Sequence, residues 1–190
     1  DEDEEDDDGE EDDEEDDAYY ALTDSEANAM RKQLKIRVAG ADGACPAPLQ
    51  GFGELRERFA CGSRLVERLS EAKFTEPTPI QRQAIPILCD GNELLAIAPT
   101  GSGKTLAFLL PIVMKLKAHK EGGPRALLLA PTKELAGQSA RILKMLSRGV
   151  SGLKSCLLSK ATAGNDFDKV DILVATPLRL KSLLQNDKIN

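Results

Sequence analysis

Apolar and polar positions along this 190-residue chain follow two alternating periods from about residue 51 onward. Apolar residues at helical spacing predict helices over residues 63–72, 80–89, 104–118, 133–147 and 178–185. Short apolar runs predict strands over residues 94–98, 126–130, 153–158 and 171–175. Upstream, a weaker pattern indicates a short helix over residues 25–36. The Gly and Pro density of "AGADGACPAP" then marks a linker before the domain begins.

Strands that alternate with helices of this length predict a fold of the α/β class. We expect a mostly parallel sheet with helices on both faces, because parallel strands are joined by right-handed crossovers. Ligands of such sheets bind beyond the carboxyl ends of the strands. Three predicted strands end in polar loops, over residues 98–105, 131–138 and 176–180, so these loops should share one functional edge.

The net charge of −7 conceals two oppositely charged parts. Residues 1–17 hold sixteen of the 32 acidic residues, which leaves 16 acidic against 25 basic residues, a net charge of +9, from Ala18 onward. We expect a disordered acidic tail and linker over residues 1–50 and a domain over residues 51–190. A basic domain is a candidate binder of phosphate-rich polymers. The tail is interpreted as a solvated spacer, as a contact for basic protein partners, or as a mask over the basic face.

The chain has neither a membrane span nor a secretory start that the sequence would reveal. No stretch approaches the roughly 18 consecutive apolar residues that a spanning helix needs. We therefore expect a soluble, intracellular protein without a membrane partner. Its first residue is Asp and not Met, so we expect the chain to begin inside a longer gene product.

The stretch "IAPTGSGKTLAF", residues 97–108, is typical of a loop that holds phosphate. Gly101 and Gly103 let successive backbone N–H groups point inward, and the helix that follows adds the positive end of its dipole. Lys104 would reach the β- and γ-phosphates, and the Thr105 hydroxyl would complete the shell of a Mg²⁺ ion. The generic pattern G-x-x-x-x-G-K-[ST] has Gly where this chain has Ala98. Nucleotide binding is the prediction, and a glycine-rich turn without a ligand is its alternative.

A second motif, "FTEPTPIQRQAIP" over residues 74–86, precedes this loop. Together with A-x-T-G-S-G-K-T over residues 98–105, it resembles the first RecA-like domain of the DEAD-box ATP-dependent RNA helicases. The resemblance implies ATP and Mg²⁺ as cofactors and RNA as partner. It implies that the ring of Phe74 stacks on adenine and that the amide of Gln81 reads its edge. The nucleotide-binding residues it implies in the loop are Ala98, Pro99, Thr100, Gly101, Ser102, Gly103, Lys104 and Thr105, with Lys104 and Thr105 catalytic and Thr105 the metal ligand.

Two further loops resemble segments that hold the RNA backbone in the same family. "PTKELAGQ" is similar to P-T-R-E-L-A-x-Q, with Lys133 in place of arginine, and "TPLRL" is similar to T-P-G-R-L, with Leu178 in place of glycine. Hydroxyl groups at helix starts and nearby cations suit phosphate contacts. The RNA-binding residues that the resemblance implies are Pro131, Thr132, Lys133, Glu134, Thr176, Pro177 and Arg179.

The chain also departs from the family pattern. The family's glycine pair between the two RNA loops has no counterpart in "LLSKATAGNDFDKVD". The acidic leader, "ERFACGSRLVERL" and the altered T-P-x-R-L are together similar to the ribosome-biogenesis DEAD-box helicases, which act on small-subunit precursor RNA. This similarity implies pre-ribosomal RNA as the target and a nuclear or nucleolar location.

The family's D-E-A-D segment and second RecA-like domain would follow Asn190. We therefore expect a partial first RecA-like domain that binds an adenine nucleotide weakly, neither hydrolyses ATP nor unwinds RNA alone, and exposes a sheet edge. Two other classes remain open: a non-catalytic module that binds nucleotide and RNA, and a small-molecule P-loop kinase.

Overall fold

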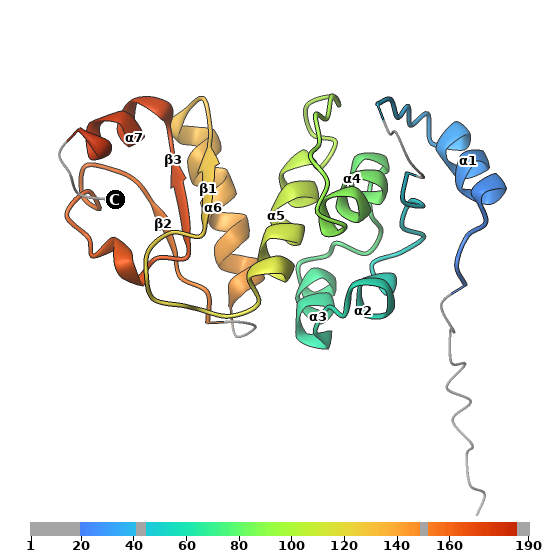
Figure 1. Cartoon of the computed structure of the whole chain (residues 1–190), viewed down its shortest axis with the longest axis horizontal. Helices are drawn as coiled ribbons and strands as arrows, with labels where there is room; N and C mark the ends of the chain where they lie inside the picture. The colour runs from blue at the N-terminus through green and yellow to red at the C-terminus, as the bar shows by residue number, and fades with distance from the viewer. Residues whose placement is uncertain (1–19, 41–44, 149–151, 186–190) are drawn as a thin grey trace, which may run out of the picture.

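The computed structural model describes residues 20–40, 45–148 and 152–185, so the acidic tract of residues 1–17 lies outside the described residues. Figure 1 shows the order of the elements along the chain. The helices are α1 (Asp24–Gln33), α2 (Glu54–Phe59), α3 (Ser63–Glu71), α4 (Pro79–Cys89), α5 (Lys104–Leu116), α6 (Lys133–Ser147), the short 3-10 helix η1 (Phe167–Lys169) and α7 (Pro177–Leu184). The strands are β1 (Ala126–Leu129), β2 (Ser155–Leu157) and β3 (Ile172–Ala175).

The three strands form a parallel sheet in the order β1-β3-β2. Ala126 of β1 and Ser155 of β2 both stand opposite Ile172, so β3 is the central strand. All four residues of β3 are buried, as expected of a parallel strand covered on both faces. The predicted parallel α/β sheet is therefore confirmed.

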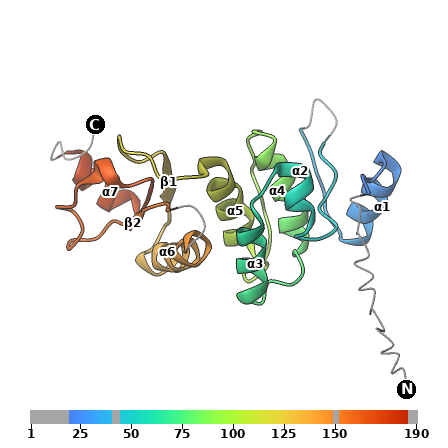
Figure 2. The same ribbon diagram turned by 90° about the horizontal axis from the view of Figure 1, so that it is seen from below.

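Helices cover both faces of this sheet because the side chains of β3 alternate in direction. Ile172 and Val174 belong to the main core, together with residues of α5 and α6. Leu173 and Ala175 belong to a second cluster that includes Leu183 of α7. Figure 2 shows α6 and α7 on opposite sides of the strands.

The other half of the structure is helical and contains the segment that precedes α5. Here α4 packs against α5, and α2 and α3 close the same core. Leu55, Leu69, Ile85 and Leu109 are fully buried in it. The core therefore continues from the sheet, through α6 and α5, to the helices near the amino terminus (Figure 1).

The predicted strand over residues 94–98 is wrong: this segment has no strand structure, and Leu95 and Ile97 are 91% and 92% exposed. A strand requires a neighbouring backbone to bond with. Within the described part of the chain, β1 pairs with β3 alone, so its other edge has no partner. A hollow of about 540 Å³, lined by Leu94 and Ala96 on one side and by β1 on the other, separates the two segments. The run of apolar residues therefore indicated correctly that the segment is hydrophobic. It could not indicate whether a neighbouring strand would be present to form backbone hydrogen bonds with it.

Asp171, directly before β3, joins three segments at the amino end of the sheet. Its side chain is fully buried. Oδ1 accepts hydrogen bonds from the backbone N–H of Lys120 (3.0 Å) and from Nε of Arg125 (3.1 Å). Oδ2 accepts one from the backbone N–H of Lys154 (2.9 Å) and lies 2.7 Å from Nδ1 of His119. This carboxylate thus holds the segment that connects α5 to β1 against the amino-terminal end of β3.

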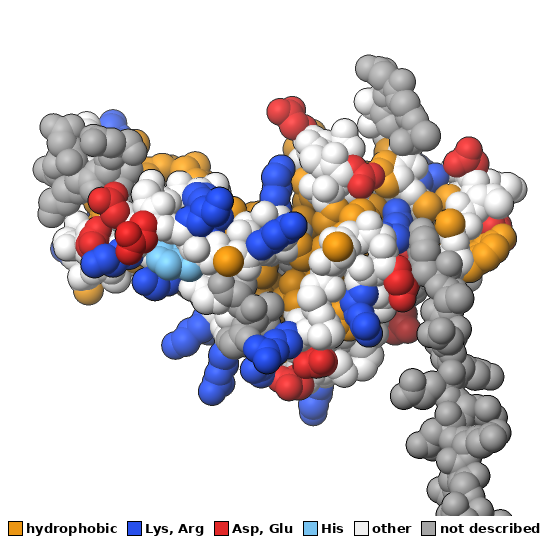
Figure 3. All heavy atoms as spheres, turned by 60° about the horizontal axis from the view of Figure 1, so that its bottom comes forward, with side chains coloured by type: hydrophobic (Ala, Val, Ile, Leu, Met, Phe, Trp, Pro, Cys, Tyr) orange, Lys and Arg blue, Asp and Glu red, His pale blue; other side chains and the backbone are white. Residues whose placement is uncertain are grey.

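The surface of this side of the molecule carries both charge and apolar groups. Figure 3 shows Lys and Arg side chains (blue) spread over this face, with Asp and Glu side chains (red) grouped among them. An apolar area (orange) is open to solvent near the middle of the view. Basic side chains therefore are not confined to the carboxyl edge of the sheet. None of the described helices is long and apolar enough to cross a membrane.

Candidate functional site

The loop before α5 has the backbone conformation that its glycines permit. Gly101 and Gly103 have φ angles of +79° and +89°, in the left-handed region that side chains other than glycine's rarely adopt. A Cβ atom on Gly103 would lie 2.4 Å from Nε2 of Gln81. Helix α5 starts at Lys104, and its first N–H groups have no acceptors within the helix. They are therefore available to an anion at the loop.

The predicted adenine-reading segment is hydrogen-bonded to this loop. The Thr78 hydroxyl donates to the Ser102 carbonyl at 2.7 Å, and Nε2 of Gln81 donates to the Gly103 carbonyl at 3.0 Å. Oε1 of Gln81 accepts from the backbone N–H of Thr78 at 3.0 Å, which closes the capping box at the start of α4. Gln81 is only 2% exposed. The start of α4 and the loop are thus one connected unit.

Lys104 also bonds to the loop itself. Its Nζ donates to the carbonyl oxygens of Ala98 and, at 2.7 Å, Pro99. The buried Oγ of Ser102 has no hydrogen-bond partner. An ammonium group, an unpartnered hydroxyl and the free N–H groups of a helix start are donors that suit phosphate oxygens. With the half-buried Thr105 as a hydroxyl ligand, this donor set fits a nucleotide phosphate chain with Mg²⁺.

Phe74 lies in the turn that precedes α4. Its ring is partly buried and packs against the main core. Its backbone N–H donates to the carbonyl of Leu69 at the end of α3, at 2.8 Å. The stacking of this ring on adenine stays a prediction.

The nucleotide loop and the first RNA loop open onto the same hollow. Lys104 and Thr105 line the hollow of about 540 Å³ together with Pro131 and Gln138. Two of the loops predicted to share an edge are therefore neighbours in space. Gln138 was missed as a site residue from the sequence. It is the last residue of "PTKELAGQ", and its spacing of three from Leu135 could have placed both on one side of α6.

The residues of the two predicted RNA loops meet in another hollow, of about 590 Å³. Lys133, Thr176 and Arg179 all line it. Figure 1 shows the arrows of β1 and β3 pointing toward the side on which α7 lies. Because parallel strands end at the same edge, the loops after β1 and β3 are brought together there. The side chain of Thr132 caps α6, its Oγ1 accepting from the N–H of Leu135 at 3.3 Å.

A polar turn after β2 lies where the family's glycine pair was expected. The N–H of Ser159 donates to Oγ1 of Thr162 at 2.8 Å, and the N–H of Thr162 donates to Oγ of Ser159 at 3.3 Å. Both Ser159 and Lys160 line the hollow that contains Lys133 and Arg179. The glycine pair is missing from the sequence here, and the Ser and Thr three residues apart in "SKAT" are the local signal that could have indicated this turn.

Glu134 brings a negative charge to the first turn of α6. Hydrogen bonds from its own backbone N–H and from the Thr132 hydroxyl lower the pKa of the Glu134 carboxyl. An ionised carboxylate accepts hydrogen bonds and donates none. Toward RNA, the carboxylate of Glu134 can therefore only accept, from a ribose 2′-hydroxyl or from a base N–H group.

A parallel α/β sheet with a glycine-rich loop before a helix, shaped for phosphate, defines the class of P-loop nucleotide-binding proteins. Residues 78–190, more than half of the chain, match the family model described as DEAD/DEAH box helicase. The chain belongs to this family, which confirms the resemblance seen in its motifs.

Proteins similar to this chain are RNA helicases by name. The chain is 47% identical over 161 residues to "DEAD-box ATP-dependent RNA helicase 57" of Oryza sativa subsp. japonica, covering 84% of this chain and 29% of that protein. It is 46% identical over 172 residues to "Probable ATP-dependent RNA helicase DDX52" of Bos taurus, covering 87% and 28%. It is 42% identical over 177 residues to "ATP-dependent RNA helicase ROK1" of Lodderomyces elongisporus, covering 88% and 32%.

The fold is similar to that of solved helicases of the same kind. The RNA helicase Prp28 of Chaetomium thermophilum, solved bound to ADP, has a TM-score of 0.75 at 30% identity, covering 92% of this chain and 43% of that one. The DEAD-box splicing factor Prp28 of yeast has a TM-score of 0.74 at 28% identity, covering 89% and 42%. The chain thus spans about three tenths of the length of the curated relatives above.

Proposed function

We propose that residues 51–190 form part of the first RecA-like domain of an ATP-dependent RNA helicase and carry its ATP-binding loop and part of its RNA-binding edge. One observation carries this proposal: Lys104 and Thr105 line the same hollow as Pro131 of the first RNA loop. A nucleotide held by the loop would therefore lie next to a segment that holds RNA. This adjacency is what a protein that couples ATP to RNA binding requires.

The nucleotide part of the proposal assigns a task to each residue. Gln81, one acceptor and one donor on a single amide, would read adenine, and Phe74 would stack on it. Lys104 would exchange the carbonyls of Ala98 and Pro99 for phosphate oxygens. Thr105 would bind Mg²⁺, which neutralises charge on the phosphates when it is bound. Residues 98–103 would curl around the phosphate chain.

The RNA part of the proposal rests on the second hollow. Lys133 and Arg179, with the hydroxyl of Thr176, would hold backbone phosphates, and Pro131, Thr132, Glu134 and Pro177 would shape the two loops. Contacts of this kind fix the strand without reading its sequence. The helicase would therefore bind single-stranded RNA of many sequences and open short duplexes.

We further propose that this helicase acts on pre-ribosomal RNA in the nucleolus. The support is the combination of acidic leader, "ERFACGSRLVERL", missing glycine pair and altered T-P-x-R-L. Crosslinking of the tagged protein to RNA in its source cells, followed by sequencing, tests this. Enrichment of small-subunit precursor RNA is expected, and enrichment of messenger or spliceosomal RNA instead would contradict it.

Nucleotide binding is tested by calorimetry of the 190-residue chain with ATP and GTP in the presence of Mg²⁺. We expect ATP to bind more tightly than GTP, and Lys104→Ala to weaken ATP binding by about tenfold or more, because a charge-assisted contact contributes about 1.5–3 kcal/mol. A Lys104→Ala variant that binds ATP as the parent does would refute the assignment of the loop.

RNA binding is tested with Arg179→Ala and a matched control, Lys169→Ala. Lys169 is an exposed residue of η1 whose side chain pairs with Asp166 at 3.2 Å. If Arg179 neutralises a phosphate, its loss should lower affinity for unrelated single strands alike and reduce the salt dependence by about one counterion. The control variant, Lys169→Ala, should keep the RNA affinity and the salt dependence of the unmutated chain. Equal effects of the two substitutions would contradict the proposed edge.

A further inference from the structure

Three consecutive side chains of α4 connect it to different parts of the structure. Gln81 donates to the nucleotide loop at Gly103. Arg82 donates to the carbonyl of Leu49 at 2.9 Å and to that of Gln50, while its own carbonyl accepts from the N–H of Leu49 at 2.8 Å. The amino-terminal part of α4 is therefore held on one side by the nucleotide loop and on the other by residues 45–50.

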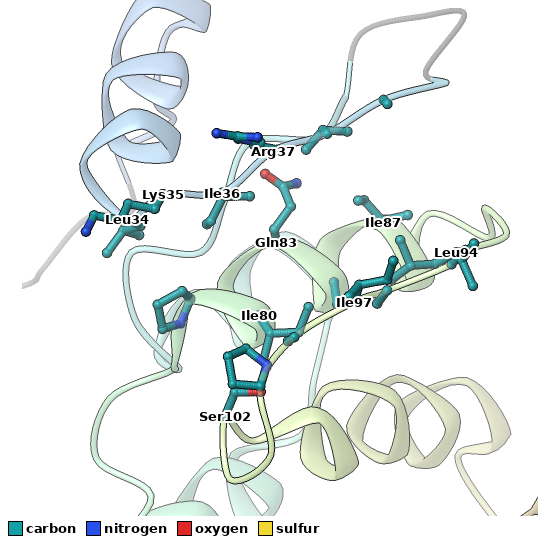
Figure 4. A pocket seen from close by; sticks show the side chains of 18 residues that line it. Leu34, Lys35, Ile36, Arg37, Ile80, Gln83, Ile87, Leu94, Ile97 and Ser102 are labelled. Atoms are coloured by element: carbon teal, nitrogen blue, oxygen red, sulfur yellow. The ribbon is translucent and has the colours of Figure 1, made fainter.

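The next side chain, Gln83, joins α4 to the segment before residue 50. It is 4% exposed. Its Nε2 donates to the carbonyl of Pro46 at 2.9 Å and contacts Sγ of Cys45 at 3.4 Å. Figure 4 shows Gln83 projecting from α4 toward the segment after α1 that carries Ile36 and Arg37. A buried amide of this kind needs a donor for its oxygen as well.

Arg31 of α1 supplies that donor. Its Nε donates to Oε1 of Gln83 at 2.8 Å, and its Nη2 donates to the carbonyls of Pro46 (2.9 Å) and Cys45 (3.1 Å). Its Nη1 donates to Oδ1 of Asn28, one helical turn earlier, at 2.8 Å. The planar guanidinium group thus bonds α1, residues 45–46 and α4 simultaneously, which a lysine could not do.

Helix α1 is itself fixed, so that Arg31 is presented in one direction. A capping box of Thr23 and Glu26 starts the helix, and Ala27 is buried beneath it. Nε2 of Gln50 donates to the carbonyl of Tyr20 at 2.8 Å. The helix is therefore tied to residues 45–50 at both of its ends.

We propose that Arg31 is a positioning residue of the nucleotide site. Through Gln83 it fixes α4, and α4 in turn sets Gln81 against the carbonyl of Gly103. Without Arg31, the buried Oε1 of Gln83 loses its hydrogen-bond donor. The first turns of α4 then shift so that this oxygen can reach another donor. Gln81 then no longer holds the geometry that distinguishes adenine from guanine. This inference rests on the proposed nucleotide function.

The test compares Arg31→Ala and Arg31→Lys with the unmutated 190-residue chain in calorimetric titrations with ATP and with GTP. The titrations are done well below the unfolding temperature of each variant, and circular dichroism confirms the fold. We expect Arg31→Ala to lower the ATP affinity by about fivefold, the size of one lost hydrogen bond, while the GTP affinity stays unchanged. Arg31→Lys should have an intermediate effect. Lys32→Ala, which removes an exposed basic side chain of the same helix, should stay within about twofold of the parent.

Each outcome has one meaning. A lower unfolding temperature of Arg31→Ala with an unchanged ratio of ATP to GTP affinity would overturn the inference, because a merely structural role would produce that result. If Arg31→Ala does not fold, the same ratio in Arg31→Lys decides. If the unmutated chain does not prefer ATP over GTP, the proposed function fails before Arg31 is tested. A preference that both Arg31 variants retain refutes this inference alone.

Discussion

Replacing Asp171 with asparagine should destabilise the fold by about 3–5 kcal/mol, within the range for breaking a buried ion pair. The substitution keeps the size and shape of a side chain that is fully buried. It removes the charge that faces Arg125, whose Nη2 lies 2.5 Å from Oδ1. The perturbation is thus confined to charge and to the direction of one hydrogen-bonding group.

The magnitude follows from the donors around the carboxylate. With the asparagine oxygen facing Arg125 and Lys120, its NH₂ group faces Nδ1 of His119 and the N–H of Lys154, and that N–H loses its acceptor. A buried donor without an acceptor costs about 1–3 kcal/mol. Arg125 in addition loses its counter-charge, and since its side chain is 25% exposed, water recovers part of that loss. Together these effects give the expected 3–5 kcal/mol, the lower end being set by solvent around Arg125.

The assay is thermal and denaturant unfolding of the purified chain at neutral pH. For a protein of this size each kcal/mol lowers the midpoint by about 2–4 °C, so we expect a decrease of roughly 6–20 °C. Asp166→Asn is the matched control, because Asp166 is exposed and pairs with the exposed Lys169. Its effect should stay below about 1 kcal/mol. A loss of less than about 1 kcal/mol in Asp171→Asn as well would refute the reasoning.

The same site predicts a dependence on pH. Burial raises the pKa of Asp171, but the hydrogen bonds from Lys154, Lys120, Arg125 and His119 outweigh it and hold the pKa well below its usual range. A lowered pKa stabilises the fold above the unfolded value of about 3.9, and this contribution is lost as the pH falls below it. The stability gap between the parent and Asp171→Asn should therefore shrink from pH 7 to pH 3. A gap of equal size at both values would contradict the charge-based explanation.

Three other predictions concern the nucleotide loop and the acidic tract. Gly103→Ala should weaken ATP binding by about tenfold, because a left-handed conformation costs about 1–2 kcal/mol for other residues and the new methyl group meets the amide of Gln81. Gly91→Ala has a similar φ of +84° and open space around it, so calorimetry should show normal ATP binding there despite lower stability. Gln81→Ala should lower the affinity for ATP and leave that for GTP nearly unchanged; equal affinities in the unmutated chain would contradict this. Deleting residues 1–17 should strengthen RNA binding at low salt, with a gain that fades as salt rises, if the tract masks the basic edge. Titrations at two salt concentrations decide this, and no change at low salt favours the solvated spacer.

Most helices could be predicted from the sequence because their signals are local. The helix over residues 133–147 was predicted with the bounds that the structure has, since Thr132 caps its start and apolar residues repeat along one side. Helix α2 was missed, because it has six residues and a glycine at its cap, too short for a period to be visible. The strand prediction for residues 94–98 was wrong for the opposite reason. The apolar residues formed a clear run, but a strand also needs a partner strand, and no local pattern shows whether one is present.

The candidate site was predictable as a set of residues but not as a set of contacts. The motifs indicated Gln81 and Lys104, yet nothing in them said that Gln81 would bond to Gly103 or Lys104 to Pro99. The contact of Gln81 depends on how α4 packs beside α5, over a separation of 22 residues, and that of Lys104 depends on the backbone path of the loop itself. The roles that the resemblance assigns to these residues in ATP and RNA binding stay predictions.

The unpaired backbone on either side of the hollow between residues 94–98 and β1 has a consequence for how copies of the chain meet. Leu127 and Leu129 of β1 are 48% and 54% exposed, and Leu95 and Ile97 are more so. Exposed edges of this kind pair with other chains. Pairing of residues 94–98 of one copy with β1 of the next would be head-to-tail, and contacts of that type continue unless a ring closes. Association between copies should therefore rise with protein concentration, and sedimentation at several concentrations checks this.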